Sequence, residues 1–157
     1  MRKIIKVFVL AILITACSSS VDANKKMAGE FLDLALSTKP LDAQELTHPD
    51  FKFVFMGNTV ISNIPNDRDA YFDYWLPEVV GKLLPNGITL TTTDMIADDD
   101  GVAVIMEGDA EGINGEYDNK YVFVYRFKDG KIFSIHEYNS DLLVATRLYK
   151  NKLVPSD

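Results

Sequence analysis

The sequence predicts a domain of the α+β class, in which helices near the amino terminus cover one face of a curved antiparallel sheet. The first half of the chain carries the apolar spacing of amphipathic helices. Strands separated by tight turns follow in the second half, and the longest of them is the aromatic segment Tyr117–Phe127. Helices first and an antiparallel meander afterwards are typical of one helical layer packed on one sheet.

Composition limits the classes of function. The 157 residues suffice for one domain with its own core, and 47% of them are hydrophobic. The formal net charge is -7, and because an acidic surface repels phosphate backbones, we expect no nucleic-acid partner. The single cysteine can form neither an intramolecular disulfide nor a multi-cysteine metal site. No sequence motif predicts a metal ion or another cofactor.

The segment Met1–Cys17 has the features of an export signal. Arg2, Lys3 and Lys6 give it a positive start, and the apolar run Val7–Ala16 follows. That run is shorter than the about 20 residues that a helix needs to cross a bilayer. We therefore predict that this segment directs export and is then removed, which leaves the remaining chain more acidic.

The end of this segment, Ile14-Thr15-Ala16-Cys17, resembles the lipobox of bacterial lipoproteins. The resemblance implies a lipid on the Cys17 sulfur, cleavage before that residue and acylation of the new amino terminus. Several acyl chains at one site hold a protein stably at a membrane. Because Ser18 rather than aspartate follows, the resemblance implies a place in the bacterial cell envelope, anchored in the outer membrane and facing the periplasm. The alternative is an ordinary secretory signal with an incidental cysteine.

Residues 18–24 are small and polar and predict a short tether. The segment Lys25–Ser37 then predicts an amphipathic helix with one buried face, and Pro40 is expected to end it. The apolar residues on that face are Met27, Phe31, Leu34 and Ala35.

Short elements lead from this helix to the first strand. Asp42–Thr47 has room for one or two helical turns, with Asp42 as their cap. His48 is expected in the loop that follows. A strand is predicted over Phe51–Met56, because aromatic residues recur at every second position: Phe51, Phe53 and Phe55.

A second helical region begins near Asn66, a residue type that favours the cap position. Pro77 lies inside this region and has no backbone N–H, so we predict a kink or a fresh helical start there. Pro85-Asn86-Gly87 ends the region. Its aromatic residues are Tyr71, Phe72, Tyr74 and Trp75.

The remaining chain predicts a four-strand meander. Asp129-Gly130 supplies the positive φ angles of a tight hairpin turn between the last two strands. The turn Asp98–Gly101 joins the first two. In chain order the predicted strands are Ile88–Ile96, Val102–Glu111, Tyr117–Phe127 and Ile132–Tyr138.

Three motifs stand out in this half: Tyr117-x-Asn119-x-Tyr121-x-Phe123, Asp129-Gly130-Lys131-Ile132 and His136-Glu137-Tyr138. Together with the runs Asn66–Ala70 and Val102–Glu107, they resemble the SnoaL-like branch of the nuclear-transport-factor-2-like superfamily, which also holds the ketosteroid isomerases. The resemblance covers roughly Asn24 to Tyr149, and the domain is taken as 25–150. Members of this superfamily include isomerases, cyclases, hydroxylases, epoxide hydrolases and proteins with no known activity, so the resemblance predicts the fold better than the reaction.

The resemblance implies a cystatin-like cone, in which helices fold over the concave face of the sheet and leave an apolar pocket. It also implies that the convex face commonly forms a homodimer. On this interpretation the aromatic face of Tyr117–Phe127 points into the cone, and the opposite face points outward. Because Val122 and Val124 would be exposed there on a monomer, we expect a homodimer.

The same interpretation yields a set of ligand-binding candidates. Aromatic residues are expected to line the pocket: Phe31, Phe55, Tyr71, Trp75, Tyr121, Phe123 and Tyr138. Three further residues are candidates for its polar groups: Glu107, Asn119 and His136.

Two of these polar residues are candidates for acid–base chemistry. Histidine titrates near neutral pH, and a bulge in the last strand decides whether His136 or Glu137 points into the cone. The alternative for His136 is a structural or surface histidine. Glu107 inside an apolar pocket would have a raised pKa, whereas at a strand end it would simply contact water.

The sequence departs from the family pattern at one position. Many relatives continue Glu-Tyr-x-Asp-Thr, whose aspartate can face the pocket, whereas this chain has Ser140 there and Asp141 one residue later. A hydroxyl without an adjacent base is not an activated nucleophile. We expect Asp141 to cap a final helical turn instead.

The preferred hypothesis is therefore a lipid-anchored envelope protein that binds a small apolar or amphipathic molecule, or a partner segment, without catalysis. A small-molecule isomerase, cyclase or hydrolase that uses Glu107 or His136 is the first alternative. The second is an interaction module whose cone is filled by its own side chains.

Overall fold

The computed structural model describes residues 20–37 and 39–154. A helix over residues 20–35 comes first, so the predicted tether is helical from residue 20 onward. The predicted export signal and Cys17 lie outside the described residues. The elements that follow are α2 (Pro40–Glu45), β1 (Thr47–Met56), β2 (Pro65–Asp67), α3 (Arg68–Ala70), the π-helix η1 (Tyr71–Val80), α4 (Gly81–Leu83), β3 (Thr89–Ala97), β4 (Val102–Asp109), β5 (Glu111–Gly112), β6 (Gly115–Glu116), β7 (Asn119–Lys128), β8 (Lys131–Tyr138), α5 (Asp141–Leu143) and the π-helix η2 (Val144–Leu148).

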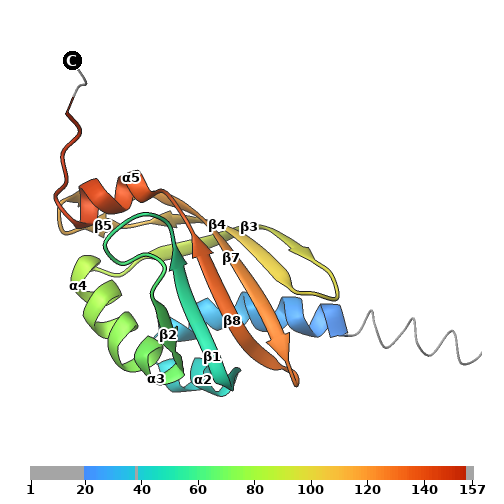
Figure 1. Cartoon of the computed structure of the whole chain (residues 1–157). Coiled ribbons are helices and arrows are strands. Elements are labelled where there is room, and N and C mark those ends of the chain that lie inside the picture. The colour runs from blue at the N-terminus through green and yellow to red at the C-terminus, as the bar shows by residue number, and fades with distance from the viewer. Residues whose placement is uncertain (1–19, 38, 155–157) are drawn as a thin grey trace, which may run out of the picture.

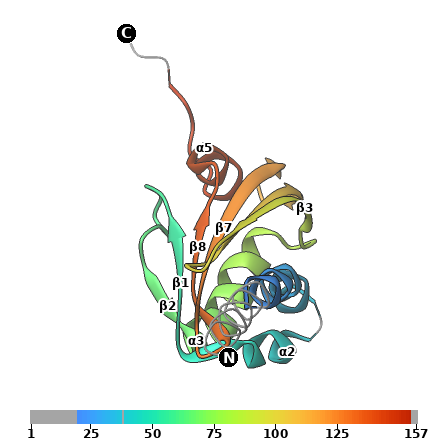
Figure 2. The same cartoon turned by 90° about the vertical axis from the view of Figure 1, so that its right-hand side faces the viewer.

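The predicted α+β class and cone are confirmed, with helices on one side of a curved six-stranded sheet (Figures 1 and 2). The strand order is β2-β1-β8-β7-β4-β3, and β5 and β6 form a separate small hairpin. The meander β3-β4-β7-β8 is antiparallel as predicted, and β1 joins it by parallel pairing with β8. Among the described residues, no helix is long and apolar enough to cross a membrane.

Alternation along β7 sorts its side chains as predicted. Tyr121, Phe123 and Tyr125 are buried, whereas Lys120 and Arg126 are exposed on the opposite face. The turn after β7 also matches, since Asp129 has a φ of 53° and Gly130 a φ of 72°. These two positive angles match the twist of the flanking strands, and they return the chain directly into β8.

A bulge in β8 settles which of its side chains face the helices. Arg126 of β7 pairs with Ser134, and its neighbour Phe127 pairs with Ile132, so Phe133 is the extra residue between them. The phase of alternation therefore changes at Phe133. As a result Ile132 and Ile135 are both buried, and Glu137 follows them on the inner face.

The helix starts differ from the predicted ones in detail. Asp67 rather than Asn66 caps α3, because its Oδ1 accepts a hydrogen bond from the backbone N–H of Ala70 at 3.0 Å. Pro40 begins α2 as well as following the first helix, and Asp42 lies in the first turn of α2 instead of capping it. Proline is favoured at a first helical position because the N–H it lacks would be unpaired there.

Pro77 does not start a new helix. The π-helix η1 runs through it without interruption from Tyr71 to Val80. Proline cannot donate the hydrogen bond of a regular α-helix, and π-type winding is one way in which a helix absorbs such a defect. Tyr71 and Trp75 thereby lie on the buried side of one continuous element.

The first helix is held to the sheet by Phe31, whose side chain is fully buried. Its ring lies 6.0 Å from the ring of Tyr71 in η1, 6.3 Å from that of Phe51 in β1 and 6.2 Å from that of Tyr125 in β7, measured between centroids. One aromatic side chain thus joins the first helix, η1 and two strands. Burying such a ring contributes roughly 1.5–3 kcal/mol to stability.

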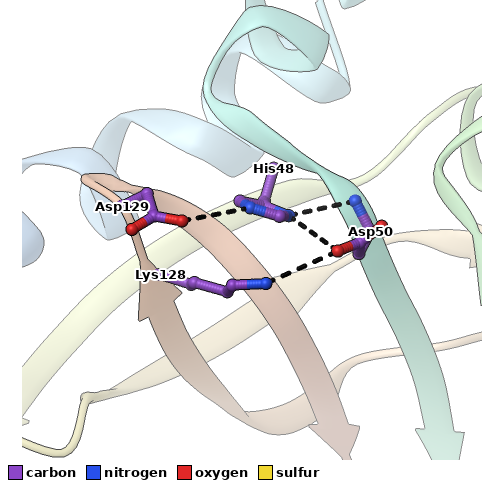
Figure 3. A network of polar contacts seen from close by, with 4 residues as sticks. All are labelled: His48, Asp50, Lys128 and Asp129. Carbon is purple, nitrogen blue, oxygen red and sulfur yellow. Dashed lines mark hydrogen bonds and ion pairs between the residues drawn. The ribbon is translucent and has the colours of Figure 1, made fainter.

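A polar cluster fixes the β7–β8 turn to the start of β1 (Figure 3). His48 lies in β1 rather than in a loop, and its Nδ1 accepts a hydrogen bond from the backbone N–H of Asp50 at 3.0 Å. Its Nε2 faces Asp129 Oδ2 at 3.5 Å, and Lys128 Nζ lies 3.5 Å from Asp50 Oδ2. The acceptor role of Nδ1 leaves Nε2 to carry the proton of a neutral ring.

Candidate functional site

An apolar cavity of about 80 Å³ lies between the concave face of the sheet and the helices. The sheet supplies Tyr121 and Phe123, whose rings stack with centroids 5.6 Å apart. The helical side supplies Trp75 in η1, whose ring lies 5.8 Å from that of Phe55. The inward side chains of β1 and β7 and the buried side chains of η1 therefore line the same cavity.

Five of the seven aromatic candidates line this cavity: Phe55, Tyr71, Trp75, Tyr121 and Phe123. Phe31 packs behind the cavity wall in the core instead. Tyr138 lies on the other face of β8 and is 44% exposed, so its predicted place in the pocket was wrong. The bulge at Phe133 is the reason, since without it Tyr138 would point to the same inner face as Ile132.

The two predicted acid–base candidates also lie outside the cavity. Glu107 is exposed on the outer face of β4, where its Oε1 lies 3.1 Å from Lys120 Nζ. Val104 and Met106 occupy the inner positions of that strand. His136 is half-buried on the outer face of β8, opposite Val124 of β7. Placing Glu107 or His136 in the pocket was therefore wrong.

Glu137 is the carboxyl group that the cavity does contain. Its Oε1 accepts a hydrogen bond from Asn139 Nδ2 at 2.9 Å. Part of its surface stays accessible because it lines the cavity, yet its carboxyl lies deep among aromatic and aliphatic side chains. This burial raises the pKa of Glu137 from 4.5 to about 8, against the opposing effect of the Asn139 hydrogen bond.

The cavity therefore holds a carboxyl group that keeps its proton at neutral pH. Such a group donates a hydrogen bond from its O–H and accepts one at its carbonyl oxygen. Tyr71 and Tyr121 are also protonated, because burial raises the pKa of each hydroxyl well above its usual value. The site can thus donate hydrogen bonds to a carbonyl or hydroxyl oxygen without bringing a charge into the pocket.

Asn119 was predicted as a polar group of the pocket, but it is buried behind the residues that line the cavity, so that placement was wrong. Its Nδ2 donates to the Tyr117 hydroxyl at 3.1 Å, and its Oδ1 accepts from the backbone N–H of Ser140 at 3.2 Å. Burial raises the pKa of Tyr117 to about 12. Asn119 therefore positions Tyr117, a cavity-lining residue, and fixes the chain as it leaves β8.

Ser140 serves a structural role at the position where many relatives have an aspartate. Its Oγ accepts the backbone N–H of Leu143 at 3.4 Å, so Ser140 rather than Asp141 caps α5. Asp141 Oδ2 instead accepts the backbone N–H of Asn58 at 2.8 Å and ties α5 to the loop after β1. Among the described residues, no group of three His, Cys, Asp or Glu side chains is placed to hold a metal ion.

A groove of about 620 Å³ adjoins the cavity. Five apolar side chains line both spaces: Leu36, Leu76, Val80, Leu84 and Ile88. The far side of the groove is polar, with Asp109 and Glu111 among its lining residues. Nothing in the sequence predicted this groove, because it forms where the end of the first helix, η1 and the strand ends meet.

The sequence left open which of two sets of alternate residues in the last strand points inward. One feature of the sequence favours the set that contains Glu137. Ile132 and Ile135 are both strongly apolar but are separated by three positions, not two. Two inward residues of one strand at an odd spacing require a bulge between them. With that bulge Glu137 points inward, as the structure has it.

The comparisons with known proteins agree with this architecture. A family model described as the SnoaL-like domain matches residues 28–135. The fold is similar to that of Bal32a from a soil-derived mobile gene cassette, at 19% identity over 82% of this chain and 96% of that one, with a TM-score of 0.67. It is also similar to a putative SnoaL-like polyketide cyclase from Jannaschia sp. CCS1, at 14% identity over 84% of this chain and 95% of that one, with a TM-score of 0.68.

A putative isomerase from Bacillus subtilis is similar as well, at 20% identity over 83% of this chain and 95% of that one, with a TM-score of 0.67. At these identities the structural likeness shows the fold alone. No curated protein sequence matches the chain.

Proposed function

The chain belongs to the SnoaL-like domain family, and from that premise we propose that it binds a small apolar or amphipathic molecule in its cone, with Glu137 donating a hydrogen bond to an oxygen of the ligand. The observation that carries the proposal is the carboxyl of Glu137 in the lining of an apolar cavity, where Asn139 Nδ2 donates a hydrogen bond to Oε1. Polar groups in an otherwise apolar pocket fix the orientation of a ligand, so the carboxyl of Glu137 favours a ligand with an oxygen atom that can pair with it.

The volumes decide how such a ligand fits. A cavity of about 80 Å³ is smaller than the roughly 300–1,000 Å³ of a typical small-molecule site, whereas the adjoining groove of about 620 Å³ falls within that range. We therefore infer that the ligand lies mainly in the groove and extends past the shared leucines toward Glu137. The competing hypothesis, a cone filled by its own side chains, is favoured by the small inner cavity and predicts no ligand.

Trp75 provides a built-in test, because it is the single tryptophan of the chain and lines the cavity. The first step is mass spectrometry of small molecules that co-purify with the native protein. Titration of these molecules, or of an uncharged apolar dye, should then shift the emission of Trp75. Absence of both a co-purified molecule and any Trp75 response to an apolar dye would favour the filled cone.

Two carboxyl variants sharpen the test. Glu137→Gln retains a hydrogen-bond donor that does not titrate, so its ligand affinity should stay constant through about pH 8, where the wild-type acid loses its proton and its affinity falls. Glu107→Gln is the matched control, because Glu107 lies on the outer face. A wild-type affinity that does not change across this pH range would contradict the role given to Glu137.

A second candidate function is acid–base catalysis of an isomerase, cyclase or hydrolase type. The observation that favours it is again Glu137, because a carboxyl with a pKa of about 8 can exchange a proton near neutral pH. An enzyme of this kind should promote deuterium exchange at carbon atoms next to the carbonyl of a bound ketone, and Glu137→Gln should abolish it while keeping the fold. If the wild-type protein bound the ligand without promoting exchange, the catalytic function would be contradicted and only the binding function would remain.

We further propose that the protein is a lipoprotein of the bacterial envelope, anchored through Cys17 with the domain facing the periplasm. The support is the lipobox-like run that ends at Cys17. Mass spectrometry of the amino-terminal peptide should find it acylated. The protein that carries Cys17→Ser should no longer be found in the membrane fraction. An unmodified Cys17 in the membrane-associated wild type would contradict this proposal.

We also propose a homodimer formed by the outer face of the sheet. Val122 and Val124 of β7 remain only half-buried in the single chain, and Ile96 of β3 is 64% exposed. Apolar side chains on an open sheet face favour a protein partner. Sedimentation should give a dimer that Val124→Lys weakens, whereas a strict monomer at micromolar concentration would contradict it.

A further inference from the structure

The charges that line the groove all have one sign. Asp109 ends β4, Glu111 lies in β5, and no lysine or arginine is among the described residues that line the groove. Neither carboxylate forms an ion pair with a described residue. One end of the groove is thus apolar and leads to the cavity, while the other presents two carboxylates that lack counter-charges.

We propose that the groove selects a cationic amphiphile, whose protonated amine binds Asp109 and Glu111 and whose apolar body packs on Leu36, Leu76 and Leu84 toward the cone. This inference rests on the proposed function, because the apolar body lies in the groove and extends toward the cavity described there. It adds the charge of the ligand and the place of its head group.

Charge complementarity is the physical basis of this choice. An ammonium group has three N–H donors and a full positive charge, so it is attracted to the two carboxylates that line this end of the groove. A fatty-acid head in the same place would meet two like charges in a protein whose net charge is already -7. An uncharged alcohol avoids this repulsion but gains no attraction, so its affinity should lie between the two.

The groove, not the cone, is the better place for the cation. The cavity is lined by apolar side chains apart from Glu137 and the tyrosine hydroxyls, and Glu137 is neutral at pH 7 because burial raises its pKa. A cation inside the cone would lose its hydration without finding a counter-charge. At Asp109 and Glu111 it keeps part of its hydration and gains two partners.

Three probes that differ only in the head group test the inference: decylamine, decanol and decanoate. Each competes with N-phenyl-1-naphthylamine, an uncharged dye, for the purified protein at pH 7 and low ionic strength. We expect decylamine to bind most tightly and decanoate least. The double variant D109N/E111Q should weaken decylamine about tenfold and leave decanol unchanged, since exposed carboxylates each contribute a modest, salt-sensitive part.

Two further variants make the result specific. D99N/D100N also removes two carboxylates, but in the turn at the opposite end of β4, and should leave all three affinities unchanged. Asn86→Lys adds a cation to the lining of the groove and should reduce the difference in affinity between decylamine and decanoate, by weakening the first and strengthening the second.

The outcomes separate this inference from the proposed function. Equal affinities for the three probes, decanoate as the tightest, or D109N/E111Q without effect on decylamine would overturn the cationic head group and leave apolar binding intact. Failure of the dye and of every probe to bind would overturn both.

Discussion

At the scale of single residues, Glu137 shows how the fold keeps a carboxyl group in an apolar space. A charged carboxylate there would lose its hydration, and one hydrogen bond from Asn139 does not replace it. The pKa is raised to about 8 as a consequence, because burying the neutral acid costs less free energy than burying the charged carboxylate. The same property that makes Glu137 a hydrogen-bond donor therefore couples the stability of the fold to pH.

The first prediction concerns this coupling. Between the unfolded pKa of 4.5 and the folded pKa of about 8, the folded protein holds a proton on Glu137 that the unfolded chain has released. Folding thus takes up a proton, and the free energy of unfolding should fall as pH rises through this range, by up to about 1.4 kcal/mol per pH unit. Below the range this contribution is complete, and above it is lost.

Comparison with Glu137→Gln isolates the effect, because the other titrating groups are the same in both proteins. Urea denaturation at several pH values should show the variant gaining stability relative to the wild type as pH rises from about 5 to about 8. Parallel pH profiles for the two proteins would mean that Glu137 titrates normally and is not buried as described.

At the scale of secondary-structure elements, the bulge at Phe133 controls the face of every later residue in β8. Deleting Phe133 should restore simple alternation and keep Ile135 and Glu137 inward, whereas deleting His136 should turn Glu137 outward and bring Tyr138 into its place. The first deletion should therefore preserve the pH dependence of stability and the second should remove it. Loss of the pH dependence on deleting Phe133 would contradict the bulge.

The β7–β8 turn yields a second prediction at this scale. Gly130 has a φ of 72° and no heavy atom within 4 Å of an added Cβ, so Gly130→Ala should cost only the conformational penalty of about 1 kcal/mol. Gly81 has a φ of -62° in a helix, where Gly81→Ala should stabilise the protein by roughly 0.5–1 kcal/mol. Chemical denaturation should give opposite signs for this one substitution at the two positions.

The elements themselves were largely predictable, because each depends on neighbours in sequence. Alternation marked β7, and Asp129-Gly130 marked its turn. The phase of β4 was not predictable, since Ala103 and Ile105 on its outer face are as apolar as Val104 on its inner face. That ambiguity is why Glu107 was assigned to the pocket.

The arrangement of elements was harder to predict than their existence. The parallel pairing of β1 with β8 joins segments far apart in the chain, and no local pattern specifies it. The groove with Asp109 and Glu111 depends on where the first helix ends relative to those strands, which is a property of tertiary packing. The sequence therefore predicted most of the aromatic residues that line the candidate site, but it did not predict which polar residues line it.

At the scale of the whole molecule, the cone depends on the packing of the first helix against the sheet, and Phe31 is the largest fully buried side chain of that helix. Its ring is fully buried among rings from η1, β1 and β7. Phe31→Ala should destabilise the fold by roughly 3–5 kcal/mol, because it removes a buried ring and leaves a void in the aromatic core. A loss of this size is a large part of the about 5–15 kcal/mol that holds a typical domain folded.

The matched control is Leu41→Ala, which removes an aliphatic side chain that is 71% exposed and should change stability by less than about 0.5 kcal/mol. Near-ultraviolet circular dichroism and urea denaturation measure the two effects together. If the first helix only rested on a sheet that is stable by itself, Phe31→Ala would leave the unfolding midpoint close to that of the wild type. A large drop, accompanied by loss of the Trp75 response to apolar dyes, would tie the ligand pocket to the packing of this one ring, because Tyr71 lies both against Phe31 and in the cavity wall.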